Sequence, residues 1–133
     1  MEKLNLRFEM AERALNRLHE VTEKIFLTDI ERDGMIQRFE FCFEILWKCG
    51  KDYLLNVEGL DAASPKKVIR LFREIGMFTD EETEKFLEMA DDRNLTSHTY
   101  DEELAEKMLS NIREYEPLMF EWFNRMIEGS LQK

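Results

Sequence analysis

Apolar residues along this 133-residue chain recur at alternating spacings of four and three. This spacing gathers apolar side chains into one stripe along a helix, and no segment alternates convincingly at the period of two that indicates a strand. The pattern predicts an all-α protein whose long helices pack nearly antiparallel through single faces. The first predicted stripe consists of Leu4, Phe8, Ala11, Leu15, Leu18, Thr22 and Ile25.

The second predicted helix is apolar around much of its circumference. Residues 28–34 are expected to form a turn, so the helix should begin at about Arg32 or Met35 and end at Leu55. Glu40, Glu44, Lys48 and Lys51 are expected to form a charged surface stripe, with Glu44 and Lys48 paired at i,i+4. Its inner face is predicted to hold Ile36, Phe39, Phe43, Leu46, Gly50 and Tyr53.

Three further helices are predicted from their caps. Ser64 and Pro65 are suited to the N-cap and first position of a short helix, which Gly76 would end. Thr79 and Glu82 form a capping box, and Asp101 caps a final long helix. We therefore expect residues 1–133 to form one domain, an antiparallel four-helix-type bundle with a short extra helix. The final inner face is predicted to hold Leu104, Met108, Ile112, Tyr115, Met119, Trp122 and Met126.

Two apolar rows remain outside these inner faces. One lies on the second helix, and the other follows Pro117 on the last helix. Large apolar rows in addition to a complete core face indicate an oligomer or partner surface, so we expect a homodimer. The rows are Phe41, Ile45 and Leu55, and then Phe120, Phe123 and Ile127.

Composition excludes several classes of protein. The N-terminal residues form no secretory signal, and no stretch approaches 18 apolar residues, so we expect a cytoplasmic protein without a membrane span. Cys42 and Cys49 would lie about 10.5 Å apart along one helix, too far for a disulfide. They lack metal-ligand spacing, and we expect neither a metal nor a cofactor. A net charge of −10 argues against a general nucleic-acid binder, although a small basic cleft is compatible with it.

The residues best suited to chemistry occur in positions 93–100, which read Arg-Asn-Leu-Thr-Ser-His-Thr-Tyr. Arg93 can hold phosphate with its planar guanidinium, and His98 belongs to the residue type that exchanges protons near neutral pH. Together they could bind or cleave a phosphodiester. The alternative is a polar turn in which these side chains only tie down the backbone. His19, beside the first apolar stripe, is expected to be a half-buried packing residue.

The motif Arg93-Asn94-x-x-x-His98-x-Tyr100 resembles the signature of HEPN-domain proteins, in the branch encoded beside minimal nucleotidyltransferases. Residues 38–48 resemble that branch's second helix, and residues 64–66 and 99–101 resemble its turns. The resemblance covers essentially the full length. It implies a homodimeric bundle, a nucleotidyltransferase partner and, in catalytic members, a metal-independent endoribonuclease. It also implies that the partner silences the toxin in some pairs by adding AMP to the motif tyrosine, here Tyr100.

Two functions fit these residues. In the first, Arg93 binds the phosphate, Asn94 orients the phosphate or holds the histidine tautomer, and His98 from each subunit of a dimer transfers a proton during RNA cleavage. In the second, the same residues hold a nucleotide or other substrate for the partner enzyme without turnover. Acidic neighbours such as Asp91, Asp92 and Glu102 favour the second. A structural adaptor without chemistry is a third hypothesis, but it does not explain the complete signature.

Overall fold

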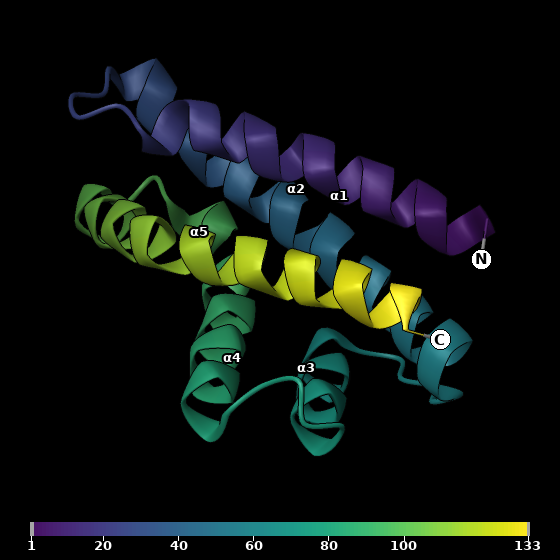
Figure 1. Cartoon of the computed structure of the whole chain (residues 1–133). Coiled ribbons are helices and arrows are strands. Elements are labelled where there is room, and N and C mark those ends of the chain that lie inside the picture. The colour runs from purple at the N-terminus through teal and green to yellow at the C-terminus, as the bar shows by residue number, and fades with distance from the viewer. Residues whose placement is uncertain (1, 133) are drawn as a thin grey trace.

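Three long helices lie side by side, and a pair of shorter helices packs against one side of them (Figure 1). The computed structural model describes residues 2–132. The all-α prediction is confirmed, with α1 antiparallel to both α2 and α5 (Figure 1). The elements are α1 (Glu2–Thr22), α2 (Asp29–Tyr53), the π-helical turn η1 (Leu54–Glu58), α3 (Pro65–Glu74), α4 (Asp80–Asn94), the 3-10 turn η2 (Thr96–His98) and α5 (Glu102–Leu131).

Capping residues begin the helices where the sequence provides them. The predicted caps Ser64, Thr79 and Asp101 are confirmed, and Gly76 has the left-handed φ of 81° expected at a helix end. The predicted start of α2 is wrong. Thr28 and Glu31 form a capping box that begins α2 at Asp29, so most of the expected turn is helical.

The first helix is shorter than its apolar spacing predicts. It ends at Thr22, and Ile25 is 83% exposed instead of continuing the buried stripe. The Thr22 hydroxyl donates to Glu116 Oε2 at 2.5 Å, and His19 Nδ1 lies 3.1 Å from Glu116 Oε1. The hydrogen bond and charge of Glu116 raise the pKa of His19. Thus His19 is not only a packing residue, because it joins α1 to a buried carboxylate on α5.

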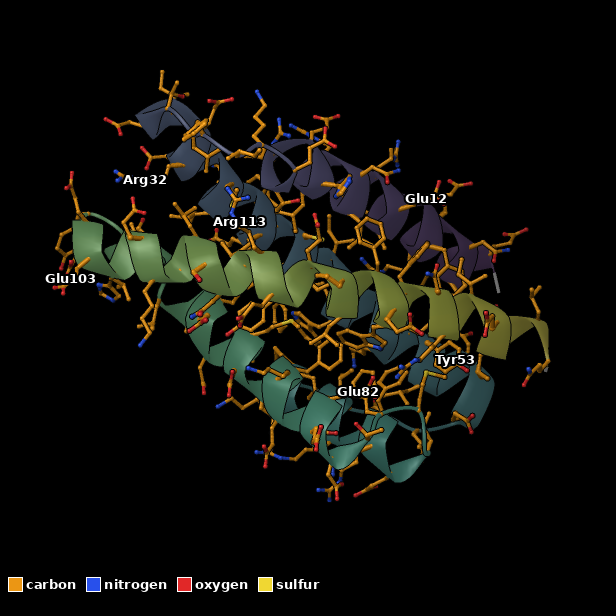
Figure 2. The ribbon with its side chains drawn as sticks, turned by 60° about the vertical axis from the view of Figure 1, so that its left-hand side comes forward. Glu12, Arg32, Tyr53, Glu82, Glu103 and Arg113 are labelled. Carbon is orange, nitrogen blue, oxygen red and sulfur yellow. The ribbon has the colours of Figure 1, made fainter. Side chains whose placement is uncertain are left out.

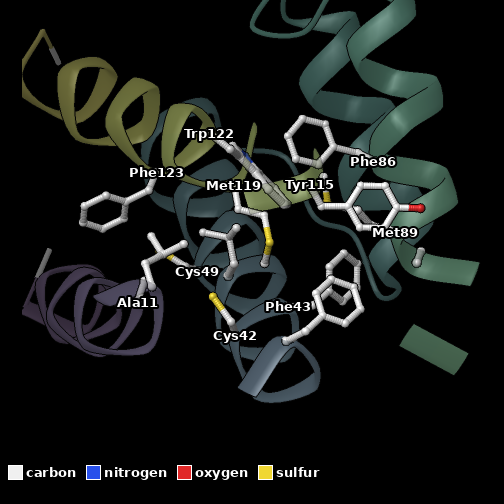
Figure 3. Packing of buried hydrophobic residues seen from close by; sticks show 14 of the residues in the cluster. Ala11, Cys42, Phe43, Cys49, Phe86, Met89, Tyr115, Met119, Trp122 and Phe123 are labelled. Atoms are coloured by element: carbon white, nitrogen blue, oxygen red, sulfur yellow. The ribbon is translucent and has the colours of Figure 1, made fainter. Parts of the chain in front are cut away.

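Aromatic packing joins the short pair to the long helices. Figure 3 shows Trp122 of α5 beside Phe86 of α4, and their ring centroids are 5.0 Å apart. Trp122 also contacts Phe72 of α3 edge-on, with centroids 5.3 Å apart. The predicted row after Pro117 is partly wrong, because Phe123 is buried and meets Phe8 of α1 edge-on. That row therefore provides no continuous exposed surface.

The close approach of α2 to Trp122 depends on Gly50. A Cβ at Gly50 would lie 2.8 Å from Trp122 and 3.1 Å from both Phe72 and Val68, whereas Gly34 of the same helix has no atom within 4 Å of such a Cβ. We predict that Gly50→Ala lowers the free energy of unfolding by about 1–3 kcal/mol through overpacking. Gly34→Ala should raise it by up to about 1 kcal/mol through helix propensity. Urea unfolding of both variants would test this, and equal effects would contradict it.

Candidate functional site

The four predicted site residues occupy the short connection between α4 and α5. Arg93 lies in the last turn of α4, Asn94 ends that helix, His98 ends η2, and Tyr100 lies in the turn before α5. The Arg93 side chain is 29% exposed. The other three residues are exposed, and Tyr100 reaches 84%. The structure therefore brings the four residues to one connection and leaves three of them accessible.

Arg93 is oriented by a carboxylate from α2. Its Nε donates to Glu44 Oε1 at 3.1 Å, while Glu44 Oε2 accepts from Trp47 Nε1 at 3.3 Å. Lys48 Nζ lies 3.8 Å from the same Oε2, so the predicted Glu44–Lys48 pair is present. Within residues 2–132, the two terminal nitrogens of Arg93 make no hydrogen bond. Because these nitrogens form the two-pronged edge of the guanidinium, Arg93 keeps the edge that binds phosphate.

The backbone of the connection is tied down by residues outside the predicted site. Thr96 is buried, and its hydroxyl lies between the Glu40 carboxylate and the Arg93 carbonyl oxygen. The Thr99 hydroxyl donates to the Thr96 carbonyl at 3.1 Å, and Asp101 caps α5. These contacts fix the turn that carries the motif.

Three of the four motif side chains take no part in this anchoring. Among the described residues, the side chains of Asn94, His98 and Tyr100 accept or donate no hydrogen bond. The rings of His98 and Tyr100 face each other edge-on with centroids 6.2 Å apart. A turn whose motif residues were only structural would use their polar atoms, as it uses those of Thr96 and Thr99. The arrangement therefore disagrees with the hypothesis of a purely structural polar turn.

Acidic residues beside the motif have structural partners. Asp92 Oδ2 accepts from Tyr115 Oη at 2.6 Å and from Asn111 Nδ2 at 3.1 Å, which fixes α4 to α5. Burial, followed by the hydrogen bond and charge of Asp92, raises the pKa of the Tyr115 phenol. Asp91 lies 2.7 Å from Lys66 Nζ. Because Asp91 and Asp92 already have partners, their repulsion of a phosphate near Arg93 is weaker than the sequence alone indicates.

A depression of about 270 Å³ adjoins Arg93. Lys66 and Arg93 bring two cationic groups to this depression, and Glu44 brings one carboxylate. The guanidinium edge that Glu44 leaves free is the part suited to an anionic ligand such as a phosphate. Sequence reasoning missed Lys66, Glu40, Glu44 and Thr96 as parts of this site, because their partners are distant along the chain. Phe43, Glu44, Ser64, Pro65, Lys66, Ala90, Arg93 and Asn94 line the depression.

The environment of the buried Cys42 and Cys49 disfavours the reactive thiolate form. Burial raises the pKa of both thiols, that of Cys49 to about 12. Figure 3 places both side chains within the packed interior.

Over residues 2–132, no three His, Cys, Asp or Glu side chains are grouped so that they could hold a metal ion. No helix in that part of the chain is long and apolar enough to cross a membrane.

The family model described as "Nucleotidyltransferase substrate binding protein like" matches residues 6–128. The chain belongs to this HEPN-type family. The resemblance stated from residues 93–100 is therefore confirmed at the level of the family.

One relative and one solved structure are similar to this chain. The chain is 34% identical over 86 residues to "Probable ribonuclease HepT" from Haemophilus influenzae, an alignment that covers 62% of this chain and 58% of the relative. It thus spans less than two thirds of that relative's length. A crystal structure from Thermus thermophilus is 47% identical, with a TM-score of 0.86 over 88% of this chain and 98% of that one. This likeness supports the same helical fold.

The two tyrosines near the motif allow a matched test of the anchoring. We predict that Tyr115→Phe lowers the free energy of unfolding by about 1–3 kcal/mol, because Asp92 loses a buried hydrogen bond. Tyr100→Phe should change it by less than about 0.5 kcal/mol, because its hydroxyl is exposed. Denaturant unfolding of the two variants would measure both values. A loss in Tyr100→Phe as large as that in Tyr115→Phe would contradict the described arrangement.

Proposed function

We propose that this HEPN-type protein is a metal-independent endoribonuclease toxin that works with a minimal nucleotidyltransferase. The observation that carries the proposal is the contrast within residues 93–100. Thr96 and Thr99 hold the backbone, whereas Asn94 and His98 keep their polar atoms free. Arg93 is positioned by Glu44 and retains a free guanidinium edge. Such an arrangement suits a ligand, and its cationic groups suit RNA phosphate.

The reaction needs two proton transfers. A base removes the proton from a 2′-hydroxyl, whose oxygen then bonds to the adjacent phosphorus. The bond from phosphorus to the 5′-oxygen breaks, and an acid protonates that oxygen. In a homodimer one His98 acts as the base and the partner subunit's His98 acts as the acid. The products carry a 2′,3′-cyclic phosphate and a 5′-hydroxyl, while Arg93 stabilises the charge on phosphorus.

The proposed dimer forms through the outer faces of α1 and α2. Met10 and Phe41 are 38% and 52% exposed there, and with Ile45 they line a groove of about 470 Å³. Glu44 lines this groove and also contacts Arg93. A second copy seated on the groove would therefore approach the motif as it covers the exposed apolar residues.

The same groove provides positive charge in a chain of net charge −10. Arg13 and Arg17 line it, and among the described residues neither side chain makes an ion pair or hydrogen bond. Arg38 also lines it, although its guanidinium contacts Glu20 at 3.1 Å. In the proposed dimer these arginines would border the covered apolar residues and attract RNA toward a cleft between the subunits. Because the proposed substrate is RNA, we place the protein in the cytoplasm.

A non-catalytic nucleotide-binding or substrate-binding subunit is the second candidate. The description of the matching family favours it, as does the acidic net charge. Arg93, Asn94 and His98 would then hold a nucleotide for the partner enzyme. The two candidates differ in one observable, since only the first predicts RNA cleavage by this chain alone.

We predict that His98→Ala reduces RNA cleavage by at least 100-fold, because general acid–base catalysis contributes about 10²–10⁴ in rate. Arg93→Lys should also be severe, since an ammonium lacks the two-pronged edge. His98→Ala should keep the wild-type circular-dichroism melt, because the His98 side chain is exposed and makes no hydrogen bond to the described residues. Cleavage of a fluorescent RNA would measure the effect, and full activity of His98→Ala would refute the assigned role.

We predict that Phe41→Arg converts the proposed dimer into a monomer of about half the mass, because it adds a cation beside Arg13 and Arg17 within the contact. Leu55→Arg is the matched control, since Leu55 is also 52% exposed but does not line the groove. Light scattering would give the masses. A 16.0 kDa wild-type species would rule out the dimer.

Regulation by the partner is proposed to act at Tyr100. The phenol oxygen bonds to the α-phosphorus of ATP, pyrophosphate leaves, and the phenol proton passes to the transferase or solvent. The accessibility of Tyr100 supports this assignment, because Tyr53 and Tyr115 are each only 2% exposed. AMP beside His98 would add bulk and negative charge where RNA phosphate must enter.

We predict that incubation with the partner and ATP adds AMP to the peptide that contains Tyr100. Tyr100→Phe should remain unmodified and retain RNA cleavage, because His98 performs the proton transfer. Mass spectrometry and the cleavage assay would measure the two properties. AMP on another residue of the wild-type chain would exclude this silencing mechanism.

A further inference from the structure

The turn between α1 and α2 exposes a cluster of large apolar side chains. Ile25, Phe26 and Ile30 are 83%, 90% and 84% exposed, and we call these three residues the end patch. Their neighbour Leu27 packs against the core instead. Adjacent large apolar residues left almost fully in water are unusual on a soluble protein and indicate a contact with another macromolecule.

The backbone that carries the end patch is held in place. Lys24 Nζ donates to Glu31 Oε2 at 2.5 Å across the turn, and Thr28 caps α2. Arg113 of α5 donates to the Thr22 carbonyl at 2.7 Å, which fixes the end of α1. The exposed side chains are therefore presented by an anchored turn, and binding them would require little ordering of the backbone.

The end patch lies at the same end of the bundle as the motif. In Figure 1 the turn between α1 and α2 lies at the end where α5 begins, opposite the two termini. Figure 2 places Arg32 and Glu103 at this end, and Arg32 Nη1 lies 3.5 Å from Glu106 Oε1. A hollow of about 560 Å³ is lined by Ile30 on one side and by Thr96 and Thr99 on the other. A partner on the end patch would thus extend over the connection that carries Tyr100.

Charge around the end patch favours a protein over RNA. Exposed carboxylates outnumber the cations around the end patch, where Lys24 pairs with Glu31 and Arg32 lies 3.8 Å from Asp33. The excess of carboxylates would repel phosphates. A protein with an apolar centre and a basic rim would be complementary to the end patch. A nucleotidyltransferase binds the polyphosphate of ATP, and Arg and Lys are the side chains suited to that contact. The exposed carboxylates include those of Asp29, Asp33, Asp101, Glu102 and Glu103.

We infer that the end patch is the docking surface for the nucleotidyltransferase that transfers AMP to Tyr100. This inference rests on the proposed modification of Tyr100 and adds where the enzyme binds. To reach the Tyr100 hydroxyl, the transferase must cover the surface next to it, and Ile30 of the end patch lines the hollow that Thr96 and Thr99 of the motif connection also line. The transferase would bury Phe26 and Ile30 while its basic rim faces Asp33 and Asp101.

The test compares Phe26→Ser with Leu131→Ser. Leu131 is 81% exposed and lies at the opposite end of the bundle, so it controls for removal of an exposed apolar side chain. The probe is the purified minimal nucleotidyltransferase proposed as the partner, titrated onto this protein by calorimetry at low and high salt. AMP on Tyr100 is followed by mass spectrometry, and RNA cleavage is measured without the partner.

We expect Phe26→Ser to weaken binding at least tenfold and to slow AMP transfer, while RNA cleavage stays at the wild-type rate. Leu131→Ser should bind as the wild type does, and high salt should weaken the wild-type complex. Wild-type binding and AMP transfer by Phe26→Ser would overturn the inference. So would a loss of self-association in Phe26→Ser, because the end patch would then join copies of this chain.

The two proposals fail in distinguishable ways. If the transferase binds the wild type and Phe26→Ser weakens that binding, but no AMP reaches Tyr100, the docking surface stands and the silencing mechanism fails. If AMP reaches Tyr100 equally in the wild type and Phe26→Ser, the silencing mechanism stands and the docking surface fails.

Discussion

The packing of Trp122 is the constraint on which the rest of the arrangement depends. This indole is fully buried where α5 meets α2, α3 and α4, with Phe78 5.3 Å away and Phe86 5.0 Å away between centroids. Its Nε1 has no hydrogen-bond partner within residues 2–132. An unsatisfied donor costs about 1–3 kcal/mol, whereas burial of roughly 200 Å² of aromatic surface contributes about 5 kcal/mol. The apolar contacts therefore hold the indole there, and they hold α4 against the long helices.

That position of α4 determines what its last turn can do. Asp92 reaches Tyr115 of α5, and Arg93 reaches Glu44 of α2, so two consecutive residues fix the turn from two sides. Thr96 adds a third attachment, to Glu40 of α2. The carboxylates of this acidic protein are thus used to position the connection. Asn94, His98 and Tyr100 stay available because neighbouring residues perform the structural work.

The sequence alone predicts the helices well, because their signals are local. The apolar spacing and the caps at Ser64, Thr79 and Asp101 act within a few residues of each other, and the structure confirms them. The start of α2 is predicted wrongly because the local capping box of Thr28 and Glu31 is overlooked, whereas at Ile25 a distant contact is the reason. Ile25 fits the spacing of α1, yet α1 ends at Thr22, whose hydroxyl binds Glu116 from the other end of the chain.

The residues of the candidate site also differ in how well the sequence predicts them. Its motif is contiguous, so Arg93 and His98 can be selected from the sequence with their chemistry. Glu40 and Glu44 cannot be selected as site residues from the sequence, because at i,i+4 spacing they resemble the solvated charged stripe of an ordinary helix. Their roles come from Thr96 and Arg93, 56 and 49 residues later. The sequence wrongly predicts Phe123 as part of an exposed apolar row for a similar reason, since only the fold brings Phe8 of α1 against it.

The most direct test of metal-independent RNA cleavage at this connection is the chemistry of the product ends. The purified protein would be incubated with a defined RNA in excess EDTA, and the fragments analysed by mass spectrometry. Attack by the 2′-oxygen predicts fragments with a 2′,3′-cyclic phosphate and a 5′-hydroxyl, formed by the wild type and absent with His98→Ala. Fragments with a 5′-phosphate whose formation EDTA abolishes, or no cleavage by the wild-type protein, would contradict the proposal.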